Sequence, residues 1–479
     1  MQDVEEVAKA AGFHPLRPAQ ARALKRVAEG QNLLVIWPTG SGKSLCYQLP
    51  AQVNPGLTLV ISPLIALMDD QVAKGRAVKW PVTCVHSNLP KAEREARLRR
   101  VAEGRIKLLY VTPERFRVPE FDELIRKLRV SLLAVDEAHC ISQWGHDFRP
   151  DYSRLAEIRK LLGDPQTIAL TATATREVQA DILKQLDLPQ STPILWEGVE
   201  RPNLHLAADE FGHEDDKFAA LVDWLAEHEG PKIVYCTLIG TLQSLSERLR
   251  AKGFAHGVYH GDLDGRARRE SQARFLSGAG ELMLATPAFG LGVDKPDIRA
   301  VAHYEIPGSI EAYFQEVGRA GRDGEKSRCR LFYRQDDLET QMRFIESLTP
   351  DPDFVRATYN LLVSWRERLP GSSLDDLRAQ LSFKNKRDFR LETAMSYLDR
   401  WGVIHYPQRR LDKLEFLREL EDGDLNAELW KARKLSLQKK LMALVRWFRS
   451  EECRKVGIYR YFGWANEEPC GFCDRCEGG

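Results

Sequence analysis

Short apolar runs alternate with longer amphipathic stretches through the first two thirds of the chain. The runs Leu33–Ile36, Thr58–Ile61, Leu108–Val111, Leu132–Val135 and Thr167–Leu170 have the length and composition of strands buried on both faces. Each run ends in polar residues that precede a helical pattern. Because strands that alternate with helices are typical of parallel sheets, the pattern predicts an α/β fold.

A second block repeats this pattern after Arg201-Pro-Asn, which has the character of a linker. Its expected strands begin at Lys232, Val258 and Leu282, and from about residue 350 the pattern changes to helices. The chain therefore divides into an α/β domain over 1–200, a second α/β domain over 201–340, a helical insertion over 341–452 and a metal-binding module over 453–479.

Composition limits the setting of the chain. With 479 residues and a net charge of +1, it can bury large cores but has no bulk field that attracts a polyanion, so any nucleic-acid surface must be local. No apolar run approaches about 18 residues, so we expect neither a signal peptide nor a membrane span. Four of the nine cysteines fall in the last 27 residues, which favours a reducing, cytoplasmic setting with one metal site over a disulfide scaffold.

The run Leu33–Ile36 leads into Pro-Thr-Gly-Ser-Gly-Lys-Ser, a phosphate-binding loop. Glycines let backbone N–H groups wrap phosphates, and the following helix N-terminus adds positive potential. Lys43 would reach the β and γ phosphates and Ser44 would hold Mg²⁺. The usual first glycine is missing, because Trp37 stands six residues before Lys43, and the sequence Pro-Thr-Gly-Ser-Gly-Lys-Ser resembles the helicase variant of the loop. The candidate nucleotide-binding residues here are Thr39, Gly40, Ser41, Gly42, Lys43 and Ser44.

Two carboxylates, Asp136 and Glu137, directly follow the run Leu132–Val135. Acids at the carboxyl edge of a parallel sheet lie where α/β proteins bind ligands. Asp136 would hold Mg²⁺ through water, and Glu137 would polarise the attacking water as general base. The alternative is that both acids only cap a helix.

Aromatic and cationic residues alternate just after these acids, at Trp144, His146, Phe148 and Arg149. Aromatic rings can stack on bases and arginine can hold phosphate, so this segment is a candidate nucleic-acid sensor. The alternative is that the aromatic residues belong to the core. Farther along, the hydroxyl groups of Thr171 and Thr173 could relay the nucleotide state.

Phe13, Arg17 and Gln20 precede a predicted helix at a spacing that could stack on and read an adenine, because a carboxamide offers both a donor and an acceptor. A plain helix entry explains the same residues equally well.

Arg319 and Arg322, three residues apart, are expected on one helix face, where they would stabilise a transferring phosphate. A surface salt bridge is the alternative. The second domain has no phosphate loop, so it should supply the partner half of a nucleotide cleft.

The spacing Cys453-x₁₆-Cys470-x₂-Cys473-x₂-Cys476 is typical of a tetrahedral zinc site with four thiolates. Because all four positions are filled by protein, the zinc should be structural. A redox-active Cys-x-x-Cys pair is the rival interpretation.

Several segments together resemble the RecQ family of superfamily 2 DNA helicases. They are Leu16–Gln20, Pro38–Gln48, Asp136–Pro150 and Ala169–Ala174, with the segment Ile141–Pro150 the most specific, and the likeness runs from about residue 12 to 335 and again over 453–476. The resemblance implies two RecA-like domains, ATP hydrolysis with Mg²⁺, zinc, and 3′-to-5′ translocation on single-stranded or forked DNA. It also implies that Thr286 and Asp294 link the DNA groove to the nucleotide site. We further expect a monomer, no membrane partner, and a single-strand-binding protein as a candidate partner.

The chain departs from the common bacterial form of the family between the second domain and the cysteines. Well over 100 residues separate Arg322 from Cys453, and the sequence ends at Gly479. We therefore expect a short form without an HRDC domain after the zinc module, which puts the family's usual duplex-splitting wedge in doubt.

Residues 355–416 of the insertion predict three helices and then two short strands, which is the winged-helix order. Lys386, Arg387 and Arg390 cluster near the start of the third helix, where a recognition helix meets DNA. The alternative is a solvated face on a segment that braces the motor.

These features favour a helicase, and two rivals remain. One is a DNA translocase that does not separate strands. The other is a non-catalytic, nucleotide-gated DNA clamp, which predicts loss of Lys43, Glu137 or the arginines, and all are present.

Overall fold

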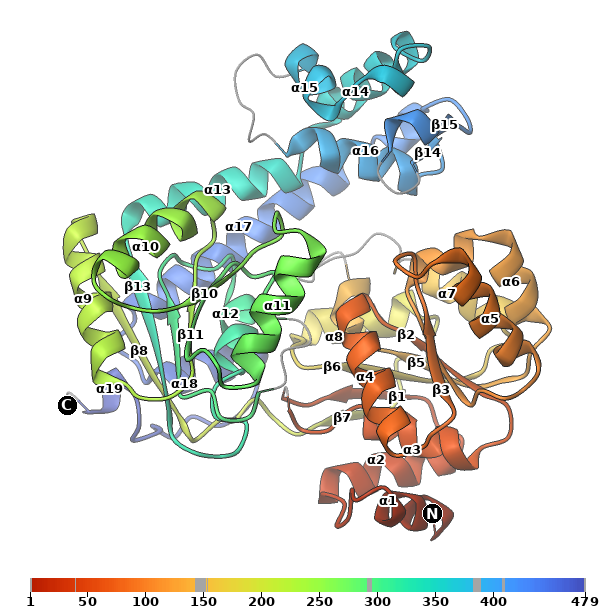
Figure 1. The fold of residues 1–479 in the computed structure, drawn as a ribbon, viewed down its shortest axis with the longest axis horizontal. Coiled ribbons are helices and arrows are strands. Elements are labelled where there is room, and N and C mark those ends of the chain that lie inside the picture. The colour runs from red at the N-terminus through yellow and green to blue at the C-terminus, as the bar shows by residue number, and fades with distance from the viewer. Residues whose placement is uncertain are drawn as a thin grey trace. The chain divides into compact units, whose positions relative to one another are not determined.

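The computed structural model describes residues 2–38, 40–142, 152, 154–290, 295–381, 389–406 and 410–477. The chain forms two compact units, Met1–Arg334 together with Arg446–Gly479, and Gln335–Val445 (Figure 1). Within the described residues, no helix is long and apolar enough to cross a membrane.

The first unit begins with a fully parallel sheet of seven strands in the order β3-β4-β2-β5-β6-β1-β7. All five apolar runs of the first block form strands of this sheet. Their side chains point into separate apolar cores on the two faces, which is why continuous apolar runs predicted them. The strands are β1 Leu33–Ile36, β2 Leu57–Ile61, β3 Val82–Val85, β4 Leu108–Val111, β5 Val130–Val135, β6 Gln166–Thr171 and β7 Ile194–Trp196.

Helices cover both faces of this sheet (Figure 1). Local signals fix several helix starts. Pro18 occupies the first turn of α2, and the Thr175 hydroxyl accepts a hydrogen bond from the Val178 N–H at the start of α8. The helices are α1 Gln2–Ala10, α2 Pro18–Ala28, α3 Leu45–Val53, α4 Ile65–Ala77, α5 Lys91–Ala102, α6 Pro119–Arg126, α7 Leu155–Leu161 and α8 Arg176–Gln185.

A second parallel sheet follows, with six strands in the order β10-β11-β9-β12-β13-β8. Asp264 and Ser309 cap the helices α11 and α12 through their side-chain oxygens. The strands are β8 Leu204–Glu210, β9 Lys232–Tyr235, β10 Gly257–Tyr259, β11 Leu282–Ala285, β12 Ala300–His303 and β13 Ser327–Tyr333. The helices are α9 Glu214–Glu227, α10 Ile239–Ala251, α11 Gly265–Leu276 and α12 Ile310–Val317.

The expected helical placement of Arg319 and Arg322 is wrong. Helix α12 ends at Val317, and Gly318 caps it, so both arginines lie in the turns that follow. Gly321 adopts a φ of 54°, a left-handed conformation that glycine tolerates and that ends any helical path. Both arginines therefore lie in the turns that connect α12 to β13.

The cysteine-rich segment returns to the second sheet of the same unit. It contains α18 Arg454–Phe462 and α19 Asp474–Glu477, and Cys473 forms a parallel bridge to Leu206 of β8. The long helix α17 Ala427–Arg449 precedes it in the chain.

The second unit has the predicted element order around its own apolar core. Ser373 caps α15 together with Asp376, and Gly402 follows α16 with a φ of 67°. Two bounds differ from the sequence pattern, which predicts helix from Val355 and strand over Leu411–Phe416: the first helix of the three begins at Pro352, and Leu411–Lys413 form a 3₁₀ turn instead of strand. The elements are α13 Gln335–Leu348, α14 Pro352–Ser364, α15 Leu374–Leu381, α16 Arg390–Arg400, and the antiparallel strands β14 Ile404–His405 and β15 Glu415–Phe416.

Candidate nucleotide site and zinc centre

The phosphate-binding loop connects β1 to α3. Gly40 and Gly42 have φ values of 82° and 78°, a left-handed conformation that favours glycine. The Lys43 ammonium group donates hydrogen bonds to the carbonyl oxygens of Trp37, at 2.8 Å, and Pro38, at 3.2 Å. Burial lowers the pKa of Lys43, while Glu137 and Asp136 act to raise it. Ser41 and Ser44 lie in the same loop, and Thr39 lies outside the described residues.

Asp136 and Glu137 stand at the carboxyl edge of the sheet, as predicted. The Asp136 N–H donates to the Ile61 carbonyl oxygen at 2.9 Å, which extends the pairing of β5 with β2 by one residue. Asp136 is buried, and this burial, with the neighbouring Glu137 carboxylate, raises its pKa to about 7 although Lys43 opposes the shift. The site thus holds two acids and one cation that shift each other's pKa values.

Glu137 has a left-handed backbone, with φ 48° and ψ 48°. This conformation costs a residue with a side chain about 1 kcal/mol or more, and such strain gathers at functional sites. Its N–H donates to Asp136 Oδ1 at 3.0 Å, and its carboxylate lies 3.3 Å from His139 Nδ1. Glu137 makes no side-chain cap to the 3₁₀ turn Ala138–Ile141 that follows, so the helix-cap alternative does not describe this acid.

His139 connects the acids to the hydroxyl pair on the next strand. Its Nδ1 lies 2.9 Å from Thr171 Oγ1, and Thr171 in turn exchanges hydrogen bonds with the backbone of Thr173. The imidazole is buried, so it can transmit a displacement of Glu137 to β6. The sequence pattern did not point to His139 as a functional residue, although its position three residues after Asp136 could have indicated such a role.

The three residues proposed to read a base have different environments. Gln20 Oε1 accepts from the Arg17 N–H at 2.9 Å, and Gln20 Nε2 donates to the carbonyl oxygens of Ser41 and Gly42, both at 3.3 Å. Gln20 is therefore tied directly to the phosphate loop. Arg17 is exposed, and the partly exposed Phe13 ring lies 5.8 Å from the Trp80 ring. Of the three residues, Gln20 contacts the phosphate loop, and Arg17 and Phe13 are more exposed to solvent.

Arg322 contacts the phosphate loop of the first sheet. A Cβ atom added to Gly40 would lie 3.2 Å from Arg322 Cδ, so the arginine packs on the loop where glycine leaves room. Arg319 instead is buried and donates to the Gly290 carbonyl oxygen, next to Tyr235. The two arginines therefore have different surroundings: one borders the loop and the other anchors the turn.

The residues expected to contact DNA are only partly within the described chain. Thr286 is buried at the end of β11, with its N–H donating to the Tyr259 carbonyl oxygen at 3.1 Å. Arg390 begins α16, and its guanidinium lies 4.7 Å from the centre of the Phe354 ring. Trp144, His146, Phe148, Arg149, Asp294, Lys386 and Arg387 lie outside the described residues.

The four cysteines of the last segment gather as predicted, with their sulfur atoms within 4.8 Å of one another. The pairs Cys453–Cys473 and Cys470–Cys476 are each separated by 3.9 Å between sulfur atoms. A tetrahedral ion with bonds of about 2.3 Å to sulfur sets such edges at about 3.8 Å, so the residues fit zinc. Burial opposes ionisation of Cys453, but backbone N–H groups outweigh it and lower its pKa to about 7.

A buried ion pair fastens this centre to the second sheet. The Arg454 guanidinium donates to both carboxylate oxygens of Asp474 at 2.9 Å, and Asp474 also accepts from the Ala208 N–H on β8 at 3.1 Å. Arg454 Nη1 donates to the Trp447 carbonyl oxygen as well, at 3.0 Å. The zinc module and the second sheet thus share one hydrogen-bond network.

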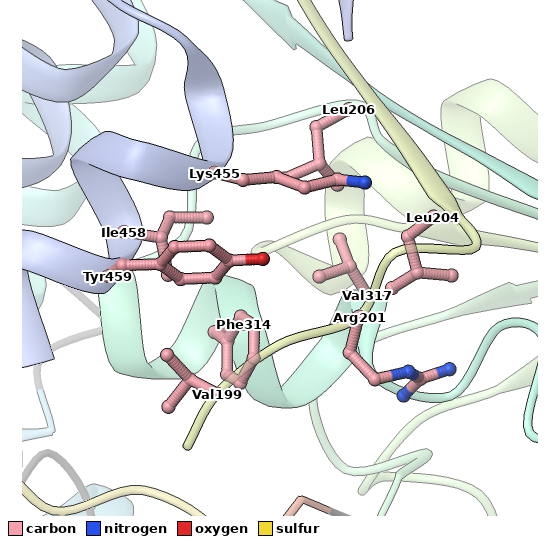
Figure 2. A pocket seen from close by; sticks show the side chains of 9 residues that line it. All are labelled: Val199, Arg201, Leu204, Leu206, Phe314, Val317, Lys455, Ile458 and Tyr459. Carbon is pink, nitrogen blue, oxygen red and sulfur yellow. The ribbon is translucent and has the colours of Figure 1, made fainter. Parts of the chain in front are cut away.

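A small cavity lies in the seam between α12, α18 and the segment that enters β8 (Figure 2). Its volume is about 10 Å³, and apolar side chains such as Val199, Phe314 and Ile458 form most of its wall. Lys455 lies at the edge and donates to the Pro202 carbonyl oxygen at 2.9 Å. Space for about one water molecule, without convergent polar groups, marks a packing seam and not a ligand site.

Comparisons with known proteins agree with this geometry. Family models match in three places: DEAD/DEAH box helicase over residues 17–181, helicase conserved C-terminal domain over 216–324, and RecQ zinc-binding over 412–477. The zinc-binding match begins well before Cys453 and includes α17.

Curated relatives match most of the chain. It is 38% identical over 360 residues to the probable ATP-dependent DNA helicase RecS of Bacillus subtilis, which covers 74% of this chain and 72% of the relative. The ATP-dependent DNA helicase RecQ of the same organism is 42% identical over 337 residues, 70% of this chain and 56% of that protein. RecQ of Pasteurella multocida is 32% identical over 465 residues, 97% of this chain and 60% of that protein. The chain thus spans just over half the length of these two RecQ proteins.

Solved structures share the fold. The Mycobacterium smegmatis helicase Lhr bound to single-stranded DNA and AMP-PNP has a TM-score of 0.57 at 21% identity, over 92% of this chain and 62% of that one. Saccharomyces cerevisiae Dbp5 bound to RNA and ADP BeF3 also has a TM-score of 0.57, at 19% identity, over 72% of this chain and 90% of that one. The sheets are thus of the RecA-like helicase type, and together with the relatives they show that this chain belongs to the RecQ family of ATP-dependent DNA helicases.

Proposed function

We propose that this chain is a DNA-stimulated ATPase and a 3′-to-5′ DNA helicase that acts on single-stranded and forked DNA during repair or recombination. The observation that carries the proposal is the contact of Arg322, from the second sheet, with the phosphate loop of the first sheet at Gly40. A nucleotide site that needs both sheets changes when they move, so hydrolysis can drive domain motion.

The residues of the site have separate tasks in this proposal. Bound Mg²⁺ would neutralise charge on the β and γ phosphates, held by Ser44 and, through water, by Asp136. Lys43 turns from the carbonyl oxygens of Trp37 and Pro38 to the phosphates. Glu137 accepts a proton from the attacking water, and Arg319 and Arg322 stabilise the charge of the transferring phosphoryl group.

The route from nucleotide to DNA begins at His139. Because this buried imidazole contacts both Glu137 and Thr171, a change at the acid alters β6. Thr286 and Asp294 serve the second sheet in the same way, and the aromatic residues of 144–148 provide stacking platforms for bases. Gln20 reads the adenine edge and, through its bonds to Ser41 and Gly42, couples that contact to the loop.

The helical unit supplies the duplex contact in this proposal. Its order α14, α15, α16, β14, β15 matches a winged helix, with Lys386, Arg387 and Arg390 at or just before the start of α16. The Arg390 guanidinium over the Phe354 ring helps to hold α14 against α16. Phosphate contacts from this cluster would position the fork junction.

The first test is ATP hydrolysis with and without single-stranded DNA. We expect low basal turnover that rises strongly with DNA, and loss of nucleotide binding in Lys43→Ala. A chain that binds ATP and DNA but never hydrolyses ATP would instead be a nucleotide-gated clamp, and the proposal would be wrong.

A further inference from the structure

A second group of metal-ligating side chains lies in the first sheet domain, remote in sequence from the four cysteines. Asp69 belongs to α4, Cys84 to β3, and His86 follows β3 directly. Their donor atoms, a carboxylate oxygen, a thiol sulfur and an imidazole nitrogen, all lie within 4.8 Å of one another. We propose that these three residues bind a second divalent cation of the zinc type.

The spacing of the donor atoms matches tetrahedral coordination. Asp69 Oδ1 lies 3.3 Å from Cys84 Sγ and 3.2 Å from His86 Nε2. Zinc bonds of about 2.3 Å to sulfur and about 2.0 Å to nitrogen or oxygen set the corresponding edges at about 3.5 Å and 3.3 Å. The sulfur pairs of the Cys453 centre come equally close to their own expected edge, at 3.9 Å against about 3.8 Å.

Solvent reaches the cluster from the side of Asp69. Cys84 and His86 are buried, whereas 54% of the Asp69 side chain is exposed, which gives an entry path and a position for water. His86 Nδ1 is buried and has no hydrogen-bond partner within the described part of the chain. The Nε2 atom, which lies 3.2 Å from Asp69 Oδ1, is therefore the ring nitrogen that would bind the ion. Three protein ligands and one open position are typical of zinc sites that exchange a ligand.

A hydrogen-bond network holds the sulfur of Cys84 in place. Arg97 Nη1 donates to Cys84 Sγ at 3.0 Å and to the Cys84 carbonyl oxygen at 2.9 Å, which fixes the position of the sulfur. The Arg97 charge is itself balanced by Glu93, at 2.5 Å from Nη2. Burial and the neighbouring Asp69 carboxylate raise the pKa of Cys84 to about 11, so binding of the ion must displace the thiol proton.

The position of the site gives it a structural consequence. Strands β2 and β3 are not neighbours, since β4 lies between them, and α4 follows β2 whereas His86 follows β3. An ion held by Asp69, Cys84 and His86 would therefore tie α4 to the loop after β3. It would fasten one end of the sheet without touching the nucleotide residues, so this site does not depend on the proposed function.

Zinc stoichiometry of the full, tag-free chain tests the proposal. Reduced protein would be equilibrated with micromolar ZnCl₂, freed of excess ion, and analysed for metal and for thermal unfolding with and without zinc. We expect two zinc ions per parental chain and one in Asp69→Asn, which keeps the shape of a half-exposed side chain and so spares the fold. His86→Asn should also lose one ion.

The matched control is Asp70→Asn, because Asp70 neighbours Asp69 on α4 but pairs with Lys74 at 3.0 Å. This variant should keep two ions per chain and the parental rise of melting temperature with zinc, whereas Asp69→Asn should lose that rise. One zinc ion in the parental chain, or equal zinc in the parent and Asp69→Asn, would mean that the three residues form a hydrogen-bonded cluster only, and the proposal would be overturned.

Discussion

Replacing Gly290 with alanine should disable turnover without unfolding the protein. Gly290 lies beside the buried guanidinium of Arg319 and accepts its hydrogen bond through the backbone carbonyl oxygen. A Cβ atom at this position would overlap the guanidinium and lie 2.8 Å from Cζ. The added methyl group therefore acts on one functional side chain, and the clash is with the far end of a side chain rather than with backbone.

The size of the effect follows from the distance that Arg319 must move. Carbon atoms in contact stay about 3.5–4.0 Å apart, so Cζ has to retreat by about 1 Å. A displacement of about 1 Å at a positioning group can cost about 10²-fold in rate, and complete loss of an arginine that stabilises phosphoryl transfer costs about 10³–10⁵-fold. We expect a fall of about 10²-fold in kcat for DNA-stimulated ATP hydrolysis, with little change in ATP affinity.

Steady-state ATPase assays and equilibrium ATP binding would measure the two quantities separately. Gly280→Ala is the matched control, because a Cβ at Gly280 would meet nothing within 4 Å. In the Arg319→Ala background, Gly290→Ala should add no further loss, since the clash has been removed. A kcat within threefold of the parent in Gly290→Ala would show that turnover does not require Arg319 at this position.

Three other variants test separate parts of the structure. Glu137→Gln should retain ATP and DNA binding but lose turnover in a single-turnover assay, because it removes the base with little change of volume; parental turnover would exclude Glu137 as the base. Arg454→Met should lower the free energy of unfolding by about 3 kcal/mol and speed zinc release to a chelator, since it removes the cation that neutralises the Asp474 carboxylate and the donor to the Trp447 carbonyl; an unchanged melting curve would mean that the ion pair does not hold the module. Neutralising Lys386, Arg387 and Arg390 together should weaken fork binding and lower the slope of log affinity against log salt by about 0.9 for each lost phosphate contact; an identical slope would leave the helical unit as scaffold.

The parallel sheets could be predicted because most of their central strands are buried on both faces. Leu33–Ile36 appears in the structure with the predicted bounds, and the loop after it carries glycines at the two left-handed positions. The zinc centre was equally readable, since four cysteines at fixed spacing have few other uses. In these places a local pattern is enough, because the chemistry depends on residues close together in sequence.

The turn after α12 shows where local pattern was misread. The spacing alone suggested that Arg319 and Arg322 share one helix face. The helix ends, however, at Gly318 just before Arg319, and Gly321 between the two arginines has a left-handed backbone. Glycine at two of the four positions 318–321 is a helix-stop signal, and it outweighs the spacing of the arginines.

Other contacts depend on sheet order and could not be read from spacing. His139 meets Thr171 because β5 pairs with β6, and Asp69 meets Cys84 across fifteen residues because α4 packs on β3. Gln20 reaches the phosphate loop only once α2 lies beside α3. Such contacts depend on the tertiary structure, and local sequence patterns do not show them.

Strand separation tests the central claim most directly. The chain would be mixed with ATP, Mg²⁺ and short labelled duplexes that carry a 3′ tail, a 5′ tail or a fork, with Glu137→Gln as the inactive control. We expect ATP-dependent release of the labelled strand from the 3′-tailed and forked duplexes, and no release with Glu137→Gln. DNA-stimulated ATP hydrolysis that separates no duplex would contradict it and would identify a translocase instead.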